Sequence, residues 1–342
     1  KSLTVAKFLT GDYSQSWQPC AQAAADAVAE ATAVDVCVAE HSPDAGIFLA
    51  RWFAEKYGVP WIADFRDPIL QPLAPAARAI YRPIAQRLLA SAGRIVGVNE
   101  HWCAIDSEIF GRPTTSIPNG FDPDEYKDRT CAPSADGPLT ISYIGNVTAQ
   151  QDLGVFLDGL GLACGELGDG RGRLRFLYRG LMADFVGAKV RATGVDAISD
   201  VGDFIPRDEA LRAQQSSDLL LVLSIARPES EDVYFRRGMH PAKVFECLGA
   251  YRPIVCVPGD RGLLDQLMVE TGSGVVLRDA GEVCRYVVDA VRARELGVPI
   301  PFAPHRDAVA RYSRRALAGR FAGVLDAVAA AHRGIELGVK VT

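Results

Sequence analysis

The chain alternates between short apolar runs and longer segments in which apolar residues recur every three or four positions. Short runs are typical of buried parallel strands, and the longer segments are typical of amphipathic helices. In the first part of the chain the pattern predicts strands at 34–41, 59–65, 94–99 and 114–122, and helices at 19–32, 44–58, 75–93 and 100–111. The second of these helices ends on Gly58, a C-cap signal.

Polar, Pro and Gly residues at 127–138 interrupt this alternation, and we interpret them as a linker. A second series follows the linker. It predicts strands at 139–146, 174–180, 198–204, 218–224, 252–258 and 274–279, and helices at 152–167, 184–194, 207–217, 241–251 and 262–272. Six strands joined by helices make a complete doubly wound domain. A last helix is predicted at 311–333.

The pattern therefore predicts an α/β protein with two doubly wound, Rossmann-like domains in tandem. Such domains bind ligands where the carboxyl ends of their strands face a cleft. The first half shows only about four strands, so we expect its opening strands to be absent from this chain.

Composition narrows the class of protein. A chain of 342 residues is long enough for two domains, and its net charge of −5 argues against nucleic acid as a main partner. No apolar run approaches the roughly 20 residues that span a bilayer. The eight cysteines form no CxxC pair, which favours a reduced, cytoplasmic protein, and the five histidines lack zinc-site spacing, so we expect no metal.

The stretch "GMHPAKVFECLGAYRPIVCV" at 238–257 carries the most informative charges. Helix N-termini attract phosphate. Gly238 permits a close backbone approach, and Pro241 suits a first helical turn. Lys243 supplies positive charge for a diphosphate, and Glu246 could accept both hydroxyls of a ribose. The alternative is a surface ion pair between Lys243 and Glu246.

Polar residues also follow two predicted strands of the first half. Asp64, Arg66 and Asp67 stand at the end of 59–65, where they could bind acceptor hydroxyls or donor phosphate; the alternative is an Arg–Asp pair that braces the loop. His41 and Ser42 end the strand at 34–41 and are acceptor-site candidates, although a histidine there also suits a hydrogen-bonded structural role. We take Asp64, Arg66 and His41 as catalytic candidates, and His41, Ser42 and Asp67 as acceptor-binding candidates.

Several stretches resemble the retaining glycosyltransferases of family 4, which have the GT-B fold. "ISYIGN", "LRFLYRG", "SSDLLLVLS" and "PAKVFECLGAYRPIVCV" are similar to the C-terminal domain of that family, "YGVPWIADFRDP" and "TTSIPNGFDPDEY" are similar to its acceptor domain, and "YSRRALAGRFAGVL" is similar to its last helix. The resemblance covers about residues 34–330.

The resemblance implies three regions: an acceptor-binding domain at 1–132, a nucleotide-sugar donor domain at 133–310, and a helix at 311–342 that crosses back to the first domain. It implies hexosyl transfer from a nucleoside-diphosphate sugar with retention, by a front-face mechanism in which the leaving diphosphate helps to deprotonate the acceptor. The acceptor is a small molecule, a glycan or a lipid-linked molecule.

The resemblance also assigns roles in donor binding. Glu246 matches the family's ribose ligand, whereas the first glutamate of its Glu-x7-Glu pattern falls on Gly238. Asn146 stands where the family often has an arginine, and the family's diphosphate lysine falls near Gln151 and Asp152. Phosphate neutralisation must then come from Lys243, Arg179, Arg236 or Arg237. The expected donor-binding residues are Glu246, Lys243, Gly145, Asn146, Arg179, Gly180, Arg237 and Phe204.

Some features imitate other sites, and some other functions stay open. "DPDE" at 122–125 imitates a metal motif, but we expect a turn that enters a helix. The basic segment "YRPIAQRLLASAGR" allows peripheral membrane contact; the alternative is a core-packed helix with solvated arginines. The other functions are a GT-B sugar-nucleotide epimerase or pseudo-glycosyltransferase, a two-lobed ligand-binding protein, and a NAD dehydrogenase, for which no GxGxxG is present.

Overall fold

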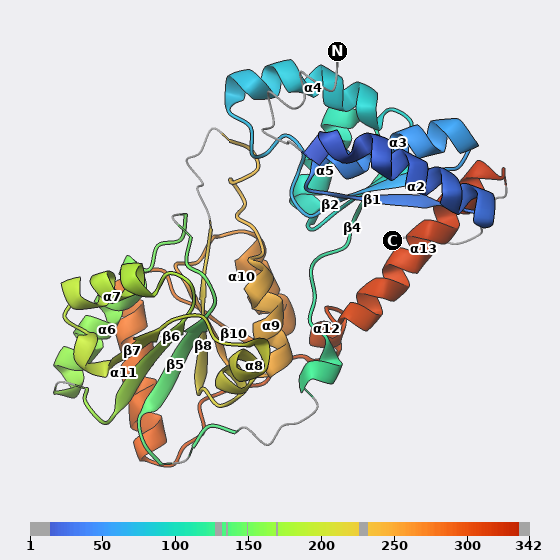
Figure 1. The fold of residues 1–342 in the computed structure, drawn as a ribbon. Helices are drawn as coiled ribbons and strands as arrows, with labels where there is room; N and C mark the ends of the chain where they lie inside the picture. Colours follow the sequence, from blue (N-terminus) through green and yellow to red (C-terminus); the bar gives the residue numbers. More distant parts are fainter. Residues whose placement is uncertain are drawn as a thin grey trace. The chain divides into compact units, whose positions relative to one another are not determined.

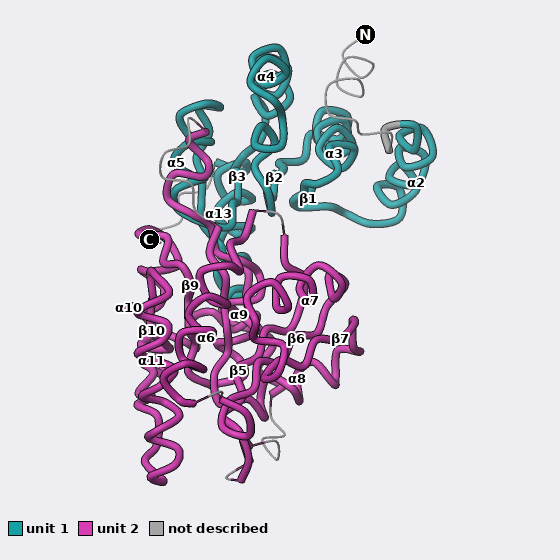
Figure 2. The backbone as a smooth tube through the Cα atoms, turned by 90° about the vertical axis from the view of Figure 1, so that its left-hand side faces the viewer, with its two compact units in different colours: residues 1–118, 317–342 teal, residues 119–316 magenta. Residues whose placement is uncertain are grey.

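The computed structural model describes residues 14–126, 132–134, 136–148, 150–168, 170–225 and 232–334. The chain forms two compact units (Figure 2): unit 1 comprises Lys1–Pro118 with Leu317–Thr342, and unit 2 comprises Asn119–Ala316. The division falls at 118/119, before the linker predicted at 127–138. Residues 127–131 and 135 of that linker lie outside the described residues.

Unit 1 contains a four-stranded parallel sheet in the order β1-β2-β3-β4, which confirms the four predicted strands. The strands are β1 (Cys37–His41), β2 (Trp61–Phe65), β3 (Arg94–Gly97) and β4 (Thr114–Ser116). The helices are α2 (Gln18–Ala31), α3 (Asp44–Tyr57), α4 (Pro75–Leu89) and α5 (Glu100–Phe110), after a short 3-10 turn η1 (Ser14–Trp17). Gly58 ends α3 at φ 65°, as the sequence predicts.

The last helix, α13 (Arg314–His332), enters the core of unit 1 (Figure 1). Its residues Leu317, Val324 and Val328 join one apolar cluster with Ile62 of β2 and Val96 of β3. One face of the unit 1 sheet is therefore buried by residues more than 200 positions away in the sequence.

Unit 2 contains a six-stranded parallel sheet in the order β10-β9-β8-β5-β6-β7, which confirms the six predicted strands. The strands are β5 (Leu139–Ile144), β6 (Leu174–Arg179), β7 (Ser199–Gly202), β8 (Leu219–Leu223), β9 (Ile254–Val257) and β10 (Gly274–Val276). Counted within the unit, this is the doubly wound order 3-2-1-4-5-6 read in reverse. The strand order reverses between β5 and β8.

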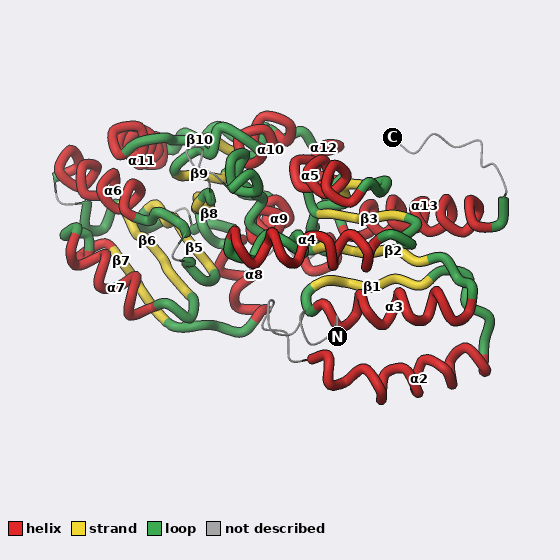
Figure 3. Tube along the Cα trace, turned by 90° about the horizontal axis from the view of Figure 1, so that it is seen from above, coloured by secondary structure: helices red, strands yellow, loops and turns green. Residues whose placement is uncertain are grey.

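Both faces of this sheet are covered. The helices are α6 (Gly154–Leu167), α7 (Ala183–Ala192), α8 (Arg207–Gln215), α9 (Ala242–Ala250), α10 (Leu263–Thr271), α11 (Ala280–Glu295) and α12 (Arg306–Ala310), with 3-10 turns η2 (Pro123–Tyr126) and η3 (Asp196–Ile198). Leu219, Leu221 and Leu223 face a core with α6 and α11, whereas Leu220 and Val222 face a core with α8, α9 and α10. Figure 3 shows these helices on opposite sides of the strands. Burial on both faces explains why β8 is apolar throughout.

The sequence pattern misses two helices of unit 2, α11 and α12. Its strand prediction at 274–279 runs too far, because Asp279 is the N-cap of α11: its side chain accepts a hydrogen bond from the backbone N–H of Glu282. Pro241, which suits a first helical turn, is instead the N-cap residue of α9 (Ala242–Ala250).

No helix in the described residues is both long and apolar enough to cross a membrane. The described cysteines are all free thiols. Cys131 lies outside the described residues.

Candidate functional site

The donor-site candidates of unit 2 meet at the point where its strand order reverses. Gly145 follows β5 and Gly180 follows β6, while the segment after β8 leads into α9, which carries Lys243 and Glu246. The carboxyl ends of parallel strands at such a reversal are the usual ligand site of doubly wound sheets. The topology therefore brings together residues that lie about 100 positions apart.

The amine of Lys243 is buried without a polar partner, although the residue as a whole is partly exposed. Its Nζ has no hydrogen bond within the described part of the chain, and it lies 3.1 Å from the centroid of the Tyr143 ring. Burial lowers the pKa of Lys243 to about 7, although the nearby Cys247 and Glu246 act in the opposite direction. An ammonium group held this way gains strongly from any anion that reaches it.

Two glycines leave room around this lysine. Gly145 has φ 131°, and a Cβ atom there would lie 2.7 Å from the Nζ of Lys243. A Cβ atom at Gly180 would lie 2.3 Å from the backbone oxygen of Gly145. Asn146 joins the two loops, since its Oδ1 accepts a hydrogen bond from the backbone N–H of Leu181 at 2.9 Å. The two loops are thus held close beside Lys243.

Glu246 is not paired with Lys243, so the surface ion pair considered from the sequence is wrong. Its Oε1 instead accepts a hydrogen bond from Nη1 of Arg207 at 2.9 Å. The same guanidinium donates from Nε and Nη2 to the two carboxylate oxygens of Glu125, at 2.7 and 2.6 Å. These bonds raise the pKa of Arg207 and lower that of Glu125. Glu246 remains partly exposed, at 31% of its side chain.

Gly238 is required where the family pattern would place an acid. It has φ 68°, and a Cβ atom there would lie 2.2 Å from Oδ2 of Asp260. Asp260 is buried and accepts hydrogen bonds from the backbone N–H groups of Gly262, Leu264 and Asp265. A carboxylate already lies beside position 238, so a second acid would meet it at close range. The neighbouring Arg236 and Arg237 are exposed.

Arg179 and Phe204 lie at the ends of β6 and β7. Arg179 is held by Asp200: its Nη2 lies 2.9 Å from Oδ1 of that residue, and its Nη1 donates to the Asp200 backbone oxygen at 3.0 Å. Its charge is therefore already partly neutralised. Phe204 follows β7 with 66% of its surface exposed, so its ring is open to stacking.

Gln151 and Asp152 stand near the position of the family's diphosphate lysine, and both make hydrogen bonds within the structure. Gln151 donates from Nε2 to the backbone oxygen of Leu223 at 3.0 Å and accepts from the backbone N–H of Thr148 at 2.9 Å. Asp152 accepts a hydrogen bond from the backbone N–H of Gly154, the first residue of α6. Both side chains shape the loop after β5, and neither supplies positive charge.

In unit 1, His41 is buried with both ring nitrogens engaged. Nδ1 lies 2.9 Å from the backbone oxygen of Asp67, and Nε2 lies 2.8 Å from Oδ1 of Asp44, whose Oδ2 accepts from the hydroxyl of Tyr81. Both partners of His41 can only accept, so the geometry fits a doubly protonated ring. Burial lowers the pKa of His41, but the hydrogen bond and charge of Asp44 outweigh it, and the net pKa is raised.

The other unit 1 candidates lie at the same edge of the sheet. Arg66 is paired with Asp64, as in the bracing alternative. Burial nevertheless raises the pKa of Asp64, despite this pairing. Ser42 and Asp67 are exposed and follow the ends of β1 and β2. The structure thus brings all five candidates to the carboxyl ends of two paired strands.

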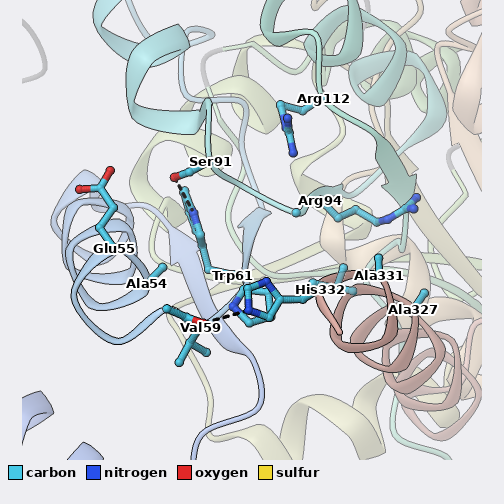
Figure 4. Close-up of a pocket in the computed structure, with 14 residues that line it drawn as sticks. Ala54, Glu55, Val59, Trp61, Ser91, Arg94, Arg112, Ala327, Ala331 and His332 are labelled. Carbon is cyan, nitrogen blue, oxygen red and sulfur yellow. Dashed lines mark hydrogen bonds between the residues drawn. The ribbon is translucent and has the colours of Figure 1, made fainter. Parts of the chain in front are cut away.

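A pocket of about 440 Å³ lies at the opposite edge of the unit 1 sheet (Figure 4). Trp61 and Arg94, which begin β2 and β3, line it together with Arg112 and with His332 of α13. Arg94 already donates to Oγ1 of Thr115, and His332 contacts the backbone oxygen of Gly58. This pocket is separate from the residues that the sequence singles out.

The acidic motif at 122–125 forms the expected turn. It enters η2, and Asp122 accepts a hydrogen bond from the backbone N–H of Asp124. Among the described residues, no three His, Cys, Asp or Glu side chains gather as they would around a metal ion.

Sequence reasoning misses three residues of the unit 2 site: Tyr143, Arg207 and Glu125. Tyr143 belongs to the quoted stretch "ISYIGN", but nothing in the sequence indicates that its ring faces Lys243. Arg207 and Glu125 lie 39 and 121 positions from Glu246 and could be found only from the tertiary structure.

No family model and no curated protein matches the sequence. Solved structures do match. HepE of Anabaena in complex with UDP and glucose is 13% identical, with a TM-score of 0.65 over 92% of this chain and 83% of that chain. A sucrose-phosphate synthase from Thermosynechococcus elongatus (13%, TM-score 0.59, 93% and 80%) and a trehalose-phosphate synthase from Burkholderia vietnamiensis (10%, 0.61, 92% and 76%) are also similar. The likeness shows that this chain has the GT-B fold of two Rossmann-like domains.

Proposed function

We propose that the protein is a glycosyltransferase that moves a sugar from a nucleoside-diphosphate donor to an acceptor hydroxyl. The observation that carries this proposal is Lys243, a buried amine without a hydrogen-bond partner in the described residues, beside Gly145 at the strand reversal of unit 2. Burying such a group is costly in the absence of an anion. A diphosphate is the anion that this position in a doubly wound sheet suits.

The diphosphate lies, in this proposal, against the glycine loops after β5 and β6 and at the N-terminus of α9. Backbone N–H groups and the helix dipole favour negative charge there, and Lys243 adds a full charge when protonated. Arg237 is exposed and lies six residues before Lys243 in the sequence, and it is a further candidate for binding the outer phosphate. Arg179 contributes less, since Asp200 holds it.

The nucleoside half of the donor is assigned to Glu246 and Phe204. Glu246 accepts the ribose hydroxyls, because its carboxylate has unused acceptor positions beside the Arg207 contact. The exposed ring of Phe204 is suited to stacking on the base. HepE, which shares the fold, has been solved with UDP and with UDP-glucose, and this makes UDP the first nucleotide to test.

We further propose hexosyl transfer with retention, by a front-face mechanism. The acceptor oxygen forms a bond to the anomeric carbon as the bond to the diphosphate oxygen breaks, and the hydroxyl proton passes to the leaving diphosphate. Lys243 stabilises the charge that develops on that group. The family 4 motifs support this mechanism. His41 supports it too, because both of its ring nitrogens are already engaged within unit 1, which leaves the leaving diphosphate to take the acceptor's proton. NMR of the product's anomeric centre tests the stereochemistry.

Unit 1 is proposed to bind the acceptor through the exposed Ser42 and Asp67, with Asp64 and Arg66 beside them. The acceptor is a small molecule, a glycan or a lipid-linked molecule. We propose a cytoplasmic location, where nucleotide sugars are available.

A thermal-shift panel of UDP, GDP, dTDP and NAD tests the function. We expect one nucleoside diphosphate to stabilise the wild type by several degrees at saturation, and Glu246→Ala to lose most of that shift. Asp289→Ala removes an exposed acid from α11 and is the matched control, which should respond like the wild type. If none of the diphosphates stabilises the protein, or if NAD does so instead, the proposal is wrong.

A further inference from the structure

We propose that Arg207 and Glu125 position the carboxylate of Glu246 for a ribose diol, a role that rests on the proposed function. Nη1 of Arg207 holds Oε1 of Glu246 at 2.9 Å, while Nε and Nη2 are held by the two oxygens of Glu125. The guanidinium thus has a defined orientation before it meets Glu246. Within the described residues, Oε2 of Glu246 takes no hydrogen bond.

Three elements bring these residues together through one apolar core. Phe121 and Tyr126 of the segment around η2 pack with Leu211 of α8 and with Val244 and Phe245 of α9. This packing brings the backbones of η2, α8 and α9 close together.

Gly249 allows Phe121 and Tyr126 to pack closely against α9. A Cβ atom there would lie 2.5 Å from Cε2 of Tyr126 and 2.9 Å from Cδ2 of Phe121. Since Glu125 precedes Tyr126 and Arg207 is the first residue of α8, the same packing fixes where both charges lie.

Stability alone gives little reason for this arrangement. The side chains of Arg207, Glu125 and Glu246 are 46%, 27% and 31% exposed, and exposed ion pairs stabilise proteins only weakly. A carboxylate that must accept two adjacent hydroxyls benefits from being fixed in advance, because its rotamer freedom is then not lost on binding. The second lone pair of Oε1 and both of Oε2 remain for the ligand.

If Glu246 binds the ribose diol, the protein should bind a nucleotide that has the diol more tightly than one that lacks it. Calorimetric titration would compare the nucleoside diphosphate that binds, UDP first, with its 2′,3′-dideoxy form. We expect the wild type to prefer the ribonucleotide by at least about tenfold, and Glu246→Gln to lose most of this preference. Arg207→Gln should reduce the preference about three- to tenfold, with little change in the affinity for the dideoxy form.

Arg207→Lys and Glu125→Gln give intermediate results in this account, because each leaves Glu246 with a looser partner. They also keep the test informative if Arg207→Gln does not fold. Arg212→Gln removes an exposed arginine from the same helix and should retain the full preference. If Arg207 had a purely structural role, its substitution would weaken the binding of both nucleotides equally, or of neither.

The outcomes separate this inference from the proposed function. If the wild type discriminates and Glu246→Gln abolishes the discrimination, but Arg207→Gln, Arg207→Lys and Glu125→Gln all retain it, the positioning role is overturned and the proposed function stands. If the wild type binds no nucleoside diphosphate, or binds both forms equally, the assignment of Glu246 fails and this inference fails with it.

Discussion

At the scale of single residues, the candidate site of unit 2 contains residues whose surroundings are unusual for their type. A lysine amine is rarely buried without a partner, yet Nζ of Lys243 lies against the ring of Tyr143 and takes no hydrogen bond in the described residues. Gly238 and Gly145 have left-handed backbone conformations beside a carboxylate and an amine, respectively. Side chains larger than glycine at positions 145 and 238 would meet this amine and this carboxylate.

Burial of Lys243 predicts a dependence of stability on pH. Its pKa is about 7 in the folded protein and 10.5 in the unfolded chain, so between these values the unfolded state binds more protons. Stability therefore rises with pH across this window as far as Lys243 is concerned. Lys243→Met removes this contribution. The difference in unfolding free energy between Lys243→Met and wild type should favour the variant at pH 7 and shrink by pH 9.

Urea unfolding at the two pH values measures this difference. Lys189→Met, at an exposed lysine of α7, is the control and should show no such trend. A constant difference between Lys243→Met and wild type would mean that Lys243 is solvated in solution.

At the scale of elements, the strands follow from sequence better than the ends of helices do. The apolar run at 218–224 predicts β8 because its residues are buried on both faces of the sheet. The start of α11 is harder to find from sequence, because its N-cap, Asp279, follows the apolar run 275–277 after one arginine and resembles the polar end of a strand. Local patterns identify interiors of elements, whereas their ends depend on individual hydrogen bonds.

The cap of α11 gives a prediction at this scale. Asp279→Ala removes the acceptor for the backbone N–H of Glu282, and α11 packs on α6 within the main core of unit 2. We expect a loss of about 1 kcal/mol in unfolding free energy. Asp279→Ser should recover most of this loss.

Asp289→Ala, in the middle of the same helix, should change stability by less than about 0.5 kcal/mol. Denaturant unfolding of the three variants checks the expectation. Equal effects of Asp279→Ala and Asp289→Ala would show that the cap does not contribute.

At the scale of the whole molecule, the sequence predicts two Rossmann-like domains but not where they divide. The linker expected at 127–138 reflects polar composition, whereas unit 2 begins at Asn119 because Phe121 and Tyr126 pack in its core. The same limit applies to the site. Lys243, Glu246 and the glycines can be found from their motifs, but Arg207 and Glu125 reach Glu246 only through that packing.

The central claim is that Lys243 holds the diphosphate of a nucleotide donor in unit 2. Calorimetric titration of wild type and Lys243→Met with UDP and UMP tests it most directly, or with the corresponding pair if the thermal-shift panel selects another base. We predict that wild type binds the diphosphate at least about tenfold more tightly than the monophosphate, or about 1.4 kcal/mol, and that Lys243→Met loses most of this preference. Equal affinity of wild type for the two nucleotides, or an undiminished preference in Lys243→Met, would contradict the claim.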